Sequence, residues 1–252
     1  MNAIAIETRV PQLRCYWLEA RSEFLRVLRA PAFAVPTLVF PPMFYLLFGV
    51  LLNGGNGKAT AYLLATYGVF GVMAPGLFGF GVAMALDRER GFLALKRAMP
   101  TPPGAMLLAK MAMAMVFAAI ISLILGTLGA TLGHVVLSPL QWVALFAIDV
   151  LGVLPFCAIG LYIGTAVSGQ GAPAVINLLY LPMAFLAGLW MPLSMLPPVF
   201  SVLAPAWPAW HLAQLALSVV GIGGGHAAMH AVVLAGVSVV FFLLARRRLA
   251  RG

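Results

Sequence analysis

The sequence predicts an all-α membrane protein with six transmembrane helices, an N-terminal amphipathic interfacial helix and a re-entrant outer hairpin between helices 5 and 6. Of its 252 residues, 63% are hydrophobic and 8% are charged, which leaves too little polar surface to cover a water-soluble globule. Six long apolar stretches run through the chain, and nearly all Lys and Arg residues lie on alternate connections. Because basic connections stay on the cytoplasmic side, both termini are predicted to be cytoplasmic.

The six apolar stretches have about the length that a helix needs to cross the hydrocarbon core of a bilayer. The predicted spans are residues 32–52, 60–86, 106–132, 141–167, 173–190 and 226–245. No segment between them is long and polar enough to form a separate soluble domain. Residues 1–252 are therefore predicted to be a single transmembrane domain.

Residues 1–30 precede the first span and contain an amphipathic pattern. Charged residues such as Glu23 and Arg26 fall on other faces than the apolar residues, which recur at helical spacing. The apolar positions are Leu13, Trp17, Phe24 and Leu28. This pattern predicts a helix that lies in the cytoplasmic interface with its aromatic side chains at head-group depth. A simple basic anchor that fixes the orientation of the chain is the alternative interpretation.

The connection after the second span, residues 87–103, carries charges at its start and at Lys96 and Arg97. These charges flank an apolar set at Phe92, Leu93 and Leu95, and a proline cluster follows. The pattern predicts a short helix, capped near Asp87, that projects below the membrane and offers a two-faced surface to a cytoplasmic partner. A solvated loop that only orients the protein in the membrane is the alternative.

Residues 191–222 follow the fifth span and are apolar but rich in proline, which breaks helices. The segment from His211 to Val220 is about half as long as a bilayer-crossing helix. These features predict a re-entrant hairpin at the outer face, where protein or a cavity must satisfy its backbone groups.

Among polar residues inside the spans, Asp149 is the one acid, and an unpaired carboxylate there costs a few kcal/mol. It either lines a transport pathway for a proton or cation, or it is a neutral, hydrogen-bonded acid. Gly160 with Gly164, and Gly129 with Gly133, have the spacing that lets helices pack closely. No catalytic, cofactor-binding or metal site is predicted.

The chain is not predicted to be an enzyme. Its nearest approach to a phosphate-binding loop, residues 52–59, has Leu52 where the first glycine should stand, and Ala59 cannot bind magnesium. The net charge of +9 lies at the cytoplasmic ends of the spans and favours anionic membrane lipids or an acidic protein surface, not nucleic acid, as a partner.

Three motifs in order and spacing resemble the type-2 ATP-binding-cassette (ABC) exporter permeases. They are the amphipathic entry helix, the loop DRERGFLALKRAMPTPP, and GLWMPLSMLPP followed by PAWPAWHLAQLAL. The resemblance implies a dimer of two permease copies in the cell inner (plasma) membrane, with two copies of an ABC ATPase subunit. ATP and Mg would be bound by that partner, since this chain is expected to hold no cofactor.

The resemblance also implies that the loop at residues 87–103 forms a coupling helix that docks on the ATPase. By that similarity the docking residues are Glu89, Arg90, Gly91, Phe92 and Leu95. The exported cargo would be lipidic, drug-like or glycan-linked. An ion-gradient-driven secondary transporter is the alternative function, although such transporters usually pair several intramembrane acids.

Overall fold

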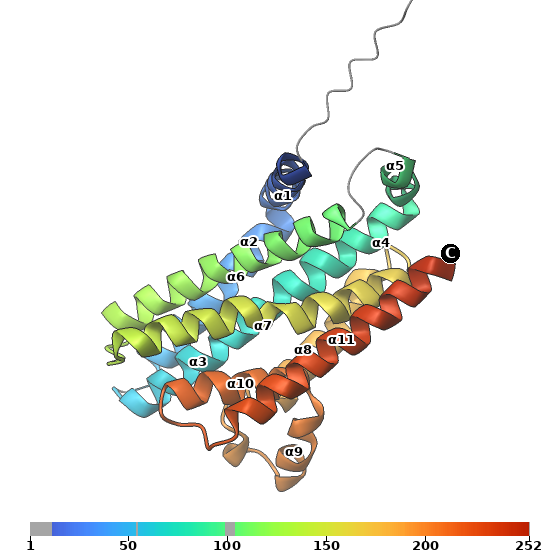
Figure 1. Ribbon diagram of the computed structural model, residues 1–252. Coiled ribbons are helices and arrows are strands. Elements are labelled where there is room, and N and C mark those ends of the chain that lie inside the picture. Colours follow the sequence, from blue (N-terminus) through green and yellow to red (C-terminus); the bar gives the residue numbers. More distant parts are fainter. Residues whose placement is uncertain (1–11, 54, 99–103, 252) are drawn as a thin grey trace, which may run out of the picture.

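The computed structural model describes residues 12–53, 55–98 and 104–251, and within these ranges it is all-helical, as predicted (Figure 1). Five helices are long and apolar enough to cross a membrane, and their ends fall within a few residues of the predicted ones. They are Pro31–Leu51, Gly57–Glu89, Ala105–Thr131, Pro139–Ala166 and Ala227–Leu249.

The first two of these five long helices each contain a π-helical turn. The first consists of α2 (Pro31–Phe44) and a π-helical end (Tyr45–Leu51), and the second joins α3 (Gly57–Ala74) to α4 (Gly81–Glu89) through a π-helical turn (Pro75–Phe80). Pro75 opens that turn because proline has no N–H to donate to the preceding turn of the helix. The other three long helices are α6 (Ala105–Thr131), α7 (Pro139–Ala166) and α11 (Ala227–Arg251).

The predicted span at residues 173–190 is a shorter helix, α8 (Ala172–Leu186), of 15 residues. At about 1.5 Å per residue it is about 22 Å long, less than the ~30 Å hydrocarbon core. The count of six spans therefore stays a prediction.

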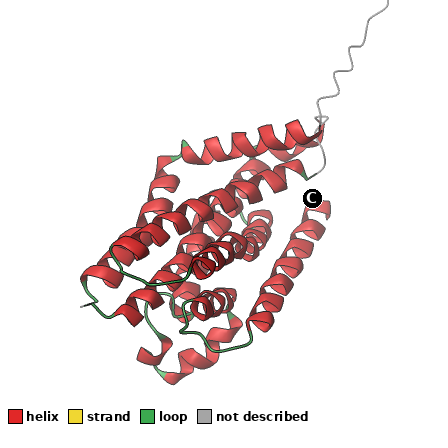
Figure 2. Ribbon diagram, turned by 60° about the vertical axis from the view of Figure 1, so that its left-hand side comes forward, coloured by secondary structure: helices red, strands yellow, loops and turns green. Residues whose placement is uncertain are grey.

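Three parts of the chain meet at one end of the helical bundle. Helix α1 (Gln12–Leu28) lies across this end and turns sharply into α2, and α5 (Phe92–Ala98) projects from it (Figures 1 and 2). The C-terminal end of α11 lies there too (Figure 1). Residues 1–11 of the predicted interfacial segment and residues 99–103 of the predicted coupling loop lie outside the described residues. The interfacial position of α1 stays a prediction.

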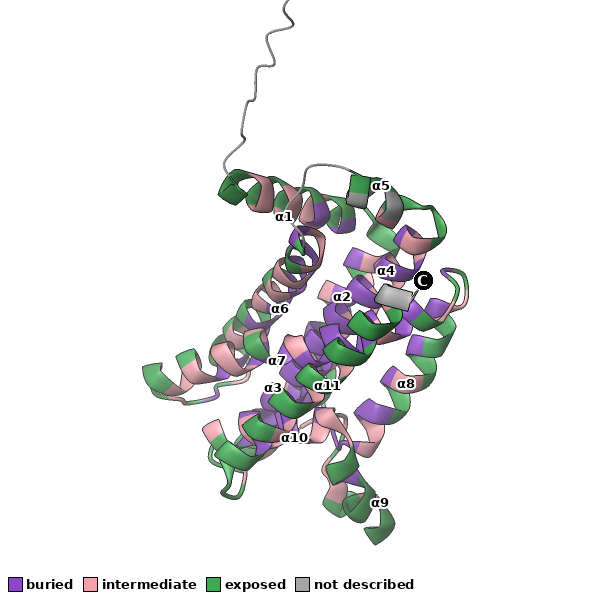
Figure 3. Cartoon of the chain, turned by 45° about the vertical axis from the view of Figure 1, so that its right-hand side comes forward, coloured by how far each residue is buried: buried purple, intermediate pink, exposed green. Residues whose placement is uncertain are grey.

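The buried core runs along α3, α4 and α7, as the colours of Figure 3 show. Glycines let α7 approach the π-helical turn Pro75–Phe80 and α4 with almost no side chain between the backbones. A Cβ atom added to Gly160 would lie 2.6 Å from the carbonyl oxygen of Gly76, and one added to Gly164 would lie 2.5 Å from that of Gly81. The close packing predicted for Gly160 and Gly164 is therefore confirmed.

The predicted hairpin at residues 191–222 is broken into short pieces at the other end of the bundle. It contains two 3₁₀ turns (Leu193–Met195 and Ala204–Ala206), α9 (Pro198–Leu203) and α10 (Pro208–Val219). Helix α9 projects from the bundle, whereas α10 is packed into it (Figure 3). The re-entrant position in a membrane stays a prediction.

Candidate functional site

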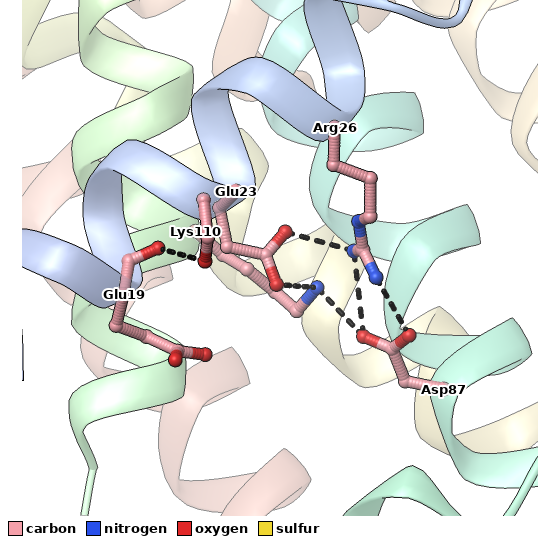
Figure 4. Close-up of polar contacts among 6 residues, drawn as sticks. Glu19, Glu23, Arg26, Asp87 and Lys110 are labelled. Carbon is pink, nitrogen blue, oxygen red and sulfur yellow. Dashed lines mark hydrogen bonds and ion pairs between the residues drawn. The ribbon is translucent and has the colours of Figure 1, made fainter.

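A fully buried lysine marks the end of the bundle where α1 and α5 lie. Lys110 is in the second turn of α6, and its side chain has no exposed surface. Its Nζ atom is 2.8 Å from Oδ2 of Asp87 on α4 and 3.2 Å from Oε1 of Glu23 on α1 (Figure 4). Both carboxylates are also buried. A buried ammonium group is tolerated in this way because it is paired with opposite charges.

Arg26 completes this cluster from the solvent side. Its guanidinium group is 2.8 Å from Oε2 of Glu23 and donates a 2.9 Å hydrogen bond to Oδ1 of Asp87 (Figure 4). Desolvation lowers the pKa of Arg26, but its bonds and charge attraction to Asp87 and Glu23 outweigh this and raise the pKa above its ordinary value. We call these four residues, Glu23, Arg26, Asp87 and Lys110, the charge cluster. Its two acids and two bases balance to zero net charge.

The charge cluster joins three helices that are far apart in the sequence. Glu23 and Arg26 come from α1, Asp87 from α4 and Lys110 from α6. Removing one member would leave an uncompensated charge in a buried place, which costs about 3–5 kcal/mol. The cluster therefore holds α1 against the ends of the two spans that flank the connection at residues 87–103.

Asp87 differs from its expected role. The sequence pattern predicted that it caps a short helix, but it lies inside α4, two residues before that helix ends, and its carboxylate binds Arg26 and Lys110. Glu23, which the sequence placed on a face of α1 other than the apolar one, is buried against Lys110. In both cases an ion pair with a residue of another helix determines where the side chain lies, and the sequence pattern around the residue does not show this partner.

The five predicted docking residues lie together where α4 passes into α5. Glu89 is the last residue of α4, Arg90 follows it, and Gly91 has a left-handed backbone with φ of 72° that turns the chain into α5. Phe92 and Leu95 are three residues apart on α5 and are 41% and 56% exposed. Side chains three apart lie on one face of a helix, so the two form an exposed apolar patch. We call Phe92 and Leu95 the α5 patch.

Two residues at the end of α4 also contact the connection between α7 and α8. Arg88 donates hydrogen bonds to the carbonyl oxygens of Thr165 and Val167, the latter at 2.7 Å. Beside it, a Cβ atom added to Gly169 would lie 2.6 Å from Oε2 of Glu89. The end of α4 that leads into α5 is therefore in contact with the end of α7 as well as with α1 and α6.

Asp149 lies apart from these residues. It is buried in α7, where it accepts a 2.8 Å hydrogen bond from Ser122 of α6. Seventeen residues separate it from the end of α7 near Arg88, which is about 25 Å of helix. The structure thus brings the five docking residues together but does not bring Asp149 to them.

Sequence reasoning missed the charge cluster, although a signal for part of it exists. Lys110 is a lone basic residue at the mouth of a span, and such residues usually have a partner. Glu23 and Arg26 are three apart on one helix, which is the spacing of an ion pair. Nothing in a single sequence shows that these groups meet across 87 positions, the separation of Lys110 and Glu23.

Comparison with known proteins shows which family this chain resembles. Residues 14–220 match the model of the family described as ABC-2 type transporter. The chain is also 28% identical over 228 residues to a Bacillus subtilis (strain 168) protein named "Putative transport permease YvfS", covering 89% of this chain and 93% of the relative. The five long apolar helices agree with a multi-pass integral membrane protein. This chain belongs to the ABC-2 type transporter family.

Proposed function

We propose that the chain is the transmembrane permease subunit of an ABC exporter that moves a lipidic, drug-like or glycan-linked cargo across the cell inner membrane. Family membership implies association with an ATP-binding subunit, and the similar Bacillus subtilis protein is named a transport permease. In this proposal two permease copies and two copies of the ATPase subunit form the exporter, and the ATPase binds the ATP and Mg.

The α5 patch is the observation that carries the proposal. Phe92 and Leu95 expose apolar side chains on a short helix that projects from the bundle, where a partner can cover them (Figure 3). Helix α4 immediately precedes α5 in the chain. It contacts α1 and α6 through the ion pairs of the charge cluster, and it contacts the end of α7 through a hydrogen bond from Arg88. A force applied to α5 by a closing ATPase would therefore reach several helices at once.

The proposed contact between α5 and the ATPase also determines how the chain would lie in the membrane. The end with α1 and α5 would face the cytoplasm, because the ATPase is there. Leu13 and Trp17, exposed apolar residues of α1, would enter the interface. Helix α8 with the turn after it would form the fifth of the six spans, and residues 191–222 would form the re-entrant hairpin at the outer face.

Reconstitution with an ABC ATPase subunit tests the proposal. In proteoliposomes, Phe92→Ala should uncouple ATP hydrolysis from transport while insertion and folding are kept. Phe48→Ala is a matched control, because Phe48 is about as exposed as Phe92 but lies in the π-helical segment Tyr45–Leu51, far from α5. If the Phe92 variant still stimulated the ATPase as the parent does, the docking assignment would be wrong. Transport that needs an ion gradient but no ATP would favour a secondary transporter instead.

Orientation can be tested separately. A cysteine introduced at exposed Leu95 should react with a membrane-impermeant thiol reagent only from the cytoplasmic side. Labelling from the outer side would contradict the proposed topology.

A further inference from the structure

A cavity of about 620 Å³ opens between α3, α6 and α7, away from the charge cluster. Its walls are apolar and aromatic and include Leu64 of α3, Leu125 of α6, and Trp142 and Phe146 of α7. This volume is within the range of about 300–1,000 Å³ that is usual for small-molecule sites.

One end of the cavity is polar. Ser122 and Asp149 line it, and Asp149 is only 2% exposed. Ser122 donates its hydroxyl to Oδ2 of Asp149 at 2.8 Å, whereas Oδ1 is buried and has no hydrogen-bond partner among the described residues. No ion pair found among the described residues includes Asp149. A carboxylate in a membrane usually faces a partner, and here the part of the chain that the structure describes supplies a partner to Oδ2 but not to Oδ1.

Two glycines give this site its shape. A Cβ atom added to Gly68 would lie 2.9 Å from Oδ2 of Asp149, so any side chain there would displace the carboxylate. Gly126 lies beside the ring of Trp142, where an added Cβ would be 3.6 Å from the indole. The ring of Trp142 forms part of the cavity wall.

The cavity opens sideways from the bundle. Leu123 and Val143 belong to its lining and are 59% and 64% exposed. Asp149 is the eleventh residue of α7, which places it about 15 Å along the helix, or about half of the hydrocarbon core. A phospholipid head group held at the membrane surface does not lie at this depth, whereas the amine of a single-chain molecule can reach it.

We propose that this cavity binds a single-chain amphiphile with a protonated amine, for which Asp149 is the counter-ion. The ammonium group pairs with the carboxylate of Asp149, whose Oδ2 is held by Ser122, and the apolar chain contacts the leucine and aromatic walls. The inference deepens the proposed function, because it names an amphiphilic amine as a cargo class. Binding itself needs only the permease.

Retention of tritiated dodecylamine by phosphatidylcholine nanodiscs that carry the full chain, without any ATPase, tests this inference. After subtraction of empty nanodiscs, the amine should bind saturably at neutral pH. Tritiated dodecanol, which has the same chain and no charge, should bind about tenfold or more weakly, as a hydrogen bond to a charged group is worth about 1.5–3 kcal/mol. Equal retention of the two probes overturns the proposal, even if no variant can be purified.

Variants locate the site. Asp149→Asn keeps the shape and the bond to Ser122 but removes the charge, and it should weaken dodecylamine binding about tenfold or more. Glu19→Gln removes a carboxylate from α1, outside the cavity, and should not change binding. Unchanged binding by Asp149→Asn overturns the proposal.

A primary amine could come from a single-chain amphiphile or from the head group of phosphatidylethanolamine, and the lipid composition of the nanodiscs distinguishes the two. Nanodiscs that contain phosphatidylethanolamine should bind dodecylamine as well as pure phosphatidylcholine nanodiscs do. Loss of binding there would assign the cavity to a lipid head group and would overturn the proposal. Because no step of the assay involves ATP or transport, failure here leaves the docking test at Phe92 as an independent result.

Discussion

Replacement of Lys110 by methionine should strongly destabilise the end of the bundle where α1 lies. Lys110 lies 2.8 Å from Asp87 and 3.2 Å from Glu23, so each Coulomb attraction is about 5–6 kcal/mol at an effective dielectric constant of about 20. Desolvation of the ammonium group offsets much of this. The net cost of breaking such a buried network is about 3–5 kcal/mol, because the variant leaves one negative charge without compensation.

Thermal unfolding of the purified chain in nanodiscs measures this effect. A loss of about 3–5 kcal/mol corresponds to a fall in the unfolding temperature of about 6–20 °C for a chain of this size. Lys58→Met is the control, because Lys58 is exposed and lies at the other end of the bundle. The double variant Lys110→Met with Glu23→Gln restores neutrality and should recover most of the loss. An unchanged unfolding temperature in the single variant, or no recovery in the double variant, would refute the reasoning.

Three other predictions concern the α4–α7 contact, the turn into α5 and the source of ATP hydrolysis. Gly160→Val should prevent stable folding, because its Cβ would lie 2.6 Å from the carbonyl oxygen of Gly76, and the fraction of monodisperse protein after purification checks this. Gly91→Ala has open space around it but keeps φ of 72°, so it should cost about 1–2 kcal/mol in unfolding measurements, whereas Gly57→Ala, which also has open space and lies at the start of a helix, should cost far less. The purified chain alone should hydrolyse no ATP, and turnover by a preparation free of other ATPases would contradict the assignment.

Most long helices could be predicted from the sequence, because each one is an uninterrupted apolar run. The run predicted at residues 106–132 is the helix Ala105–Thr131, and the one at 141–167 is Pro139–Ala166. Where prolines interrupt the apolar pattern, prediction is weaker. The span expected at residues 173–190 ends as a regular helix at Leu186, because the left-handed Gly188 lies beyond it.

The charge cluster shows what a single sequence cannot give. Local spacing explains the Glu23–Arg26 pair, but the contacts of Lys110 depend on how α1 crosses α4 and α6. The docking residues are a different case. The resemblance placed Phe92 in a projecting connection, and the structure exposes it there, yet its contact with an ATPase stays a prediction.

The π-helical turn at Pro75–Phe80 determines which way Asp87 points. A π-helical turn holds one residue more than an α-helical turn, and each residue rotates a helix by about 100°. The side chains of α4 are therefore rotated about the helix axis relative to where a regular continuation of α3 would place them. If the turn relaxed into a regular helix, Asp87 would swing about a quarter of a revolution away from Lys110 and Arg26. The π-helical turn lies at least seven residues before Asp87. It thus determines whether Asp87 can form the ion pairs that hold α1 against α4 and α6.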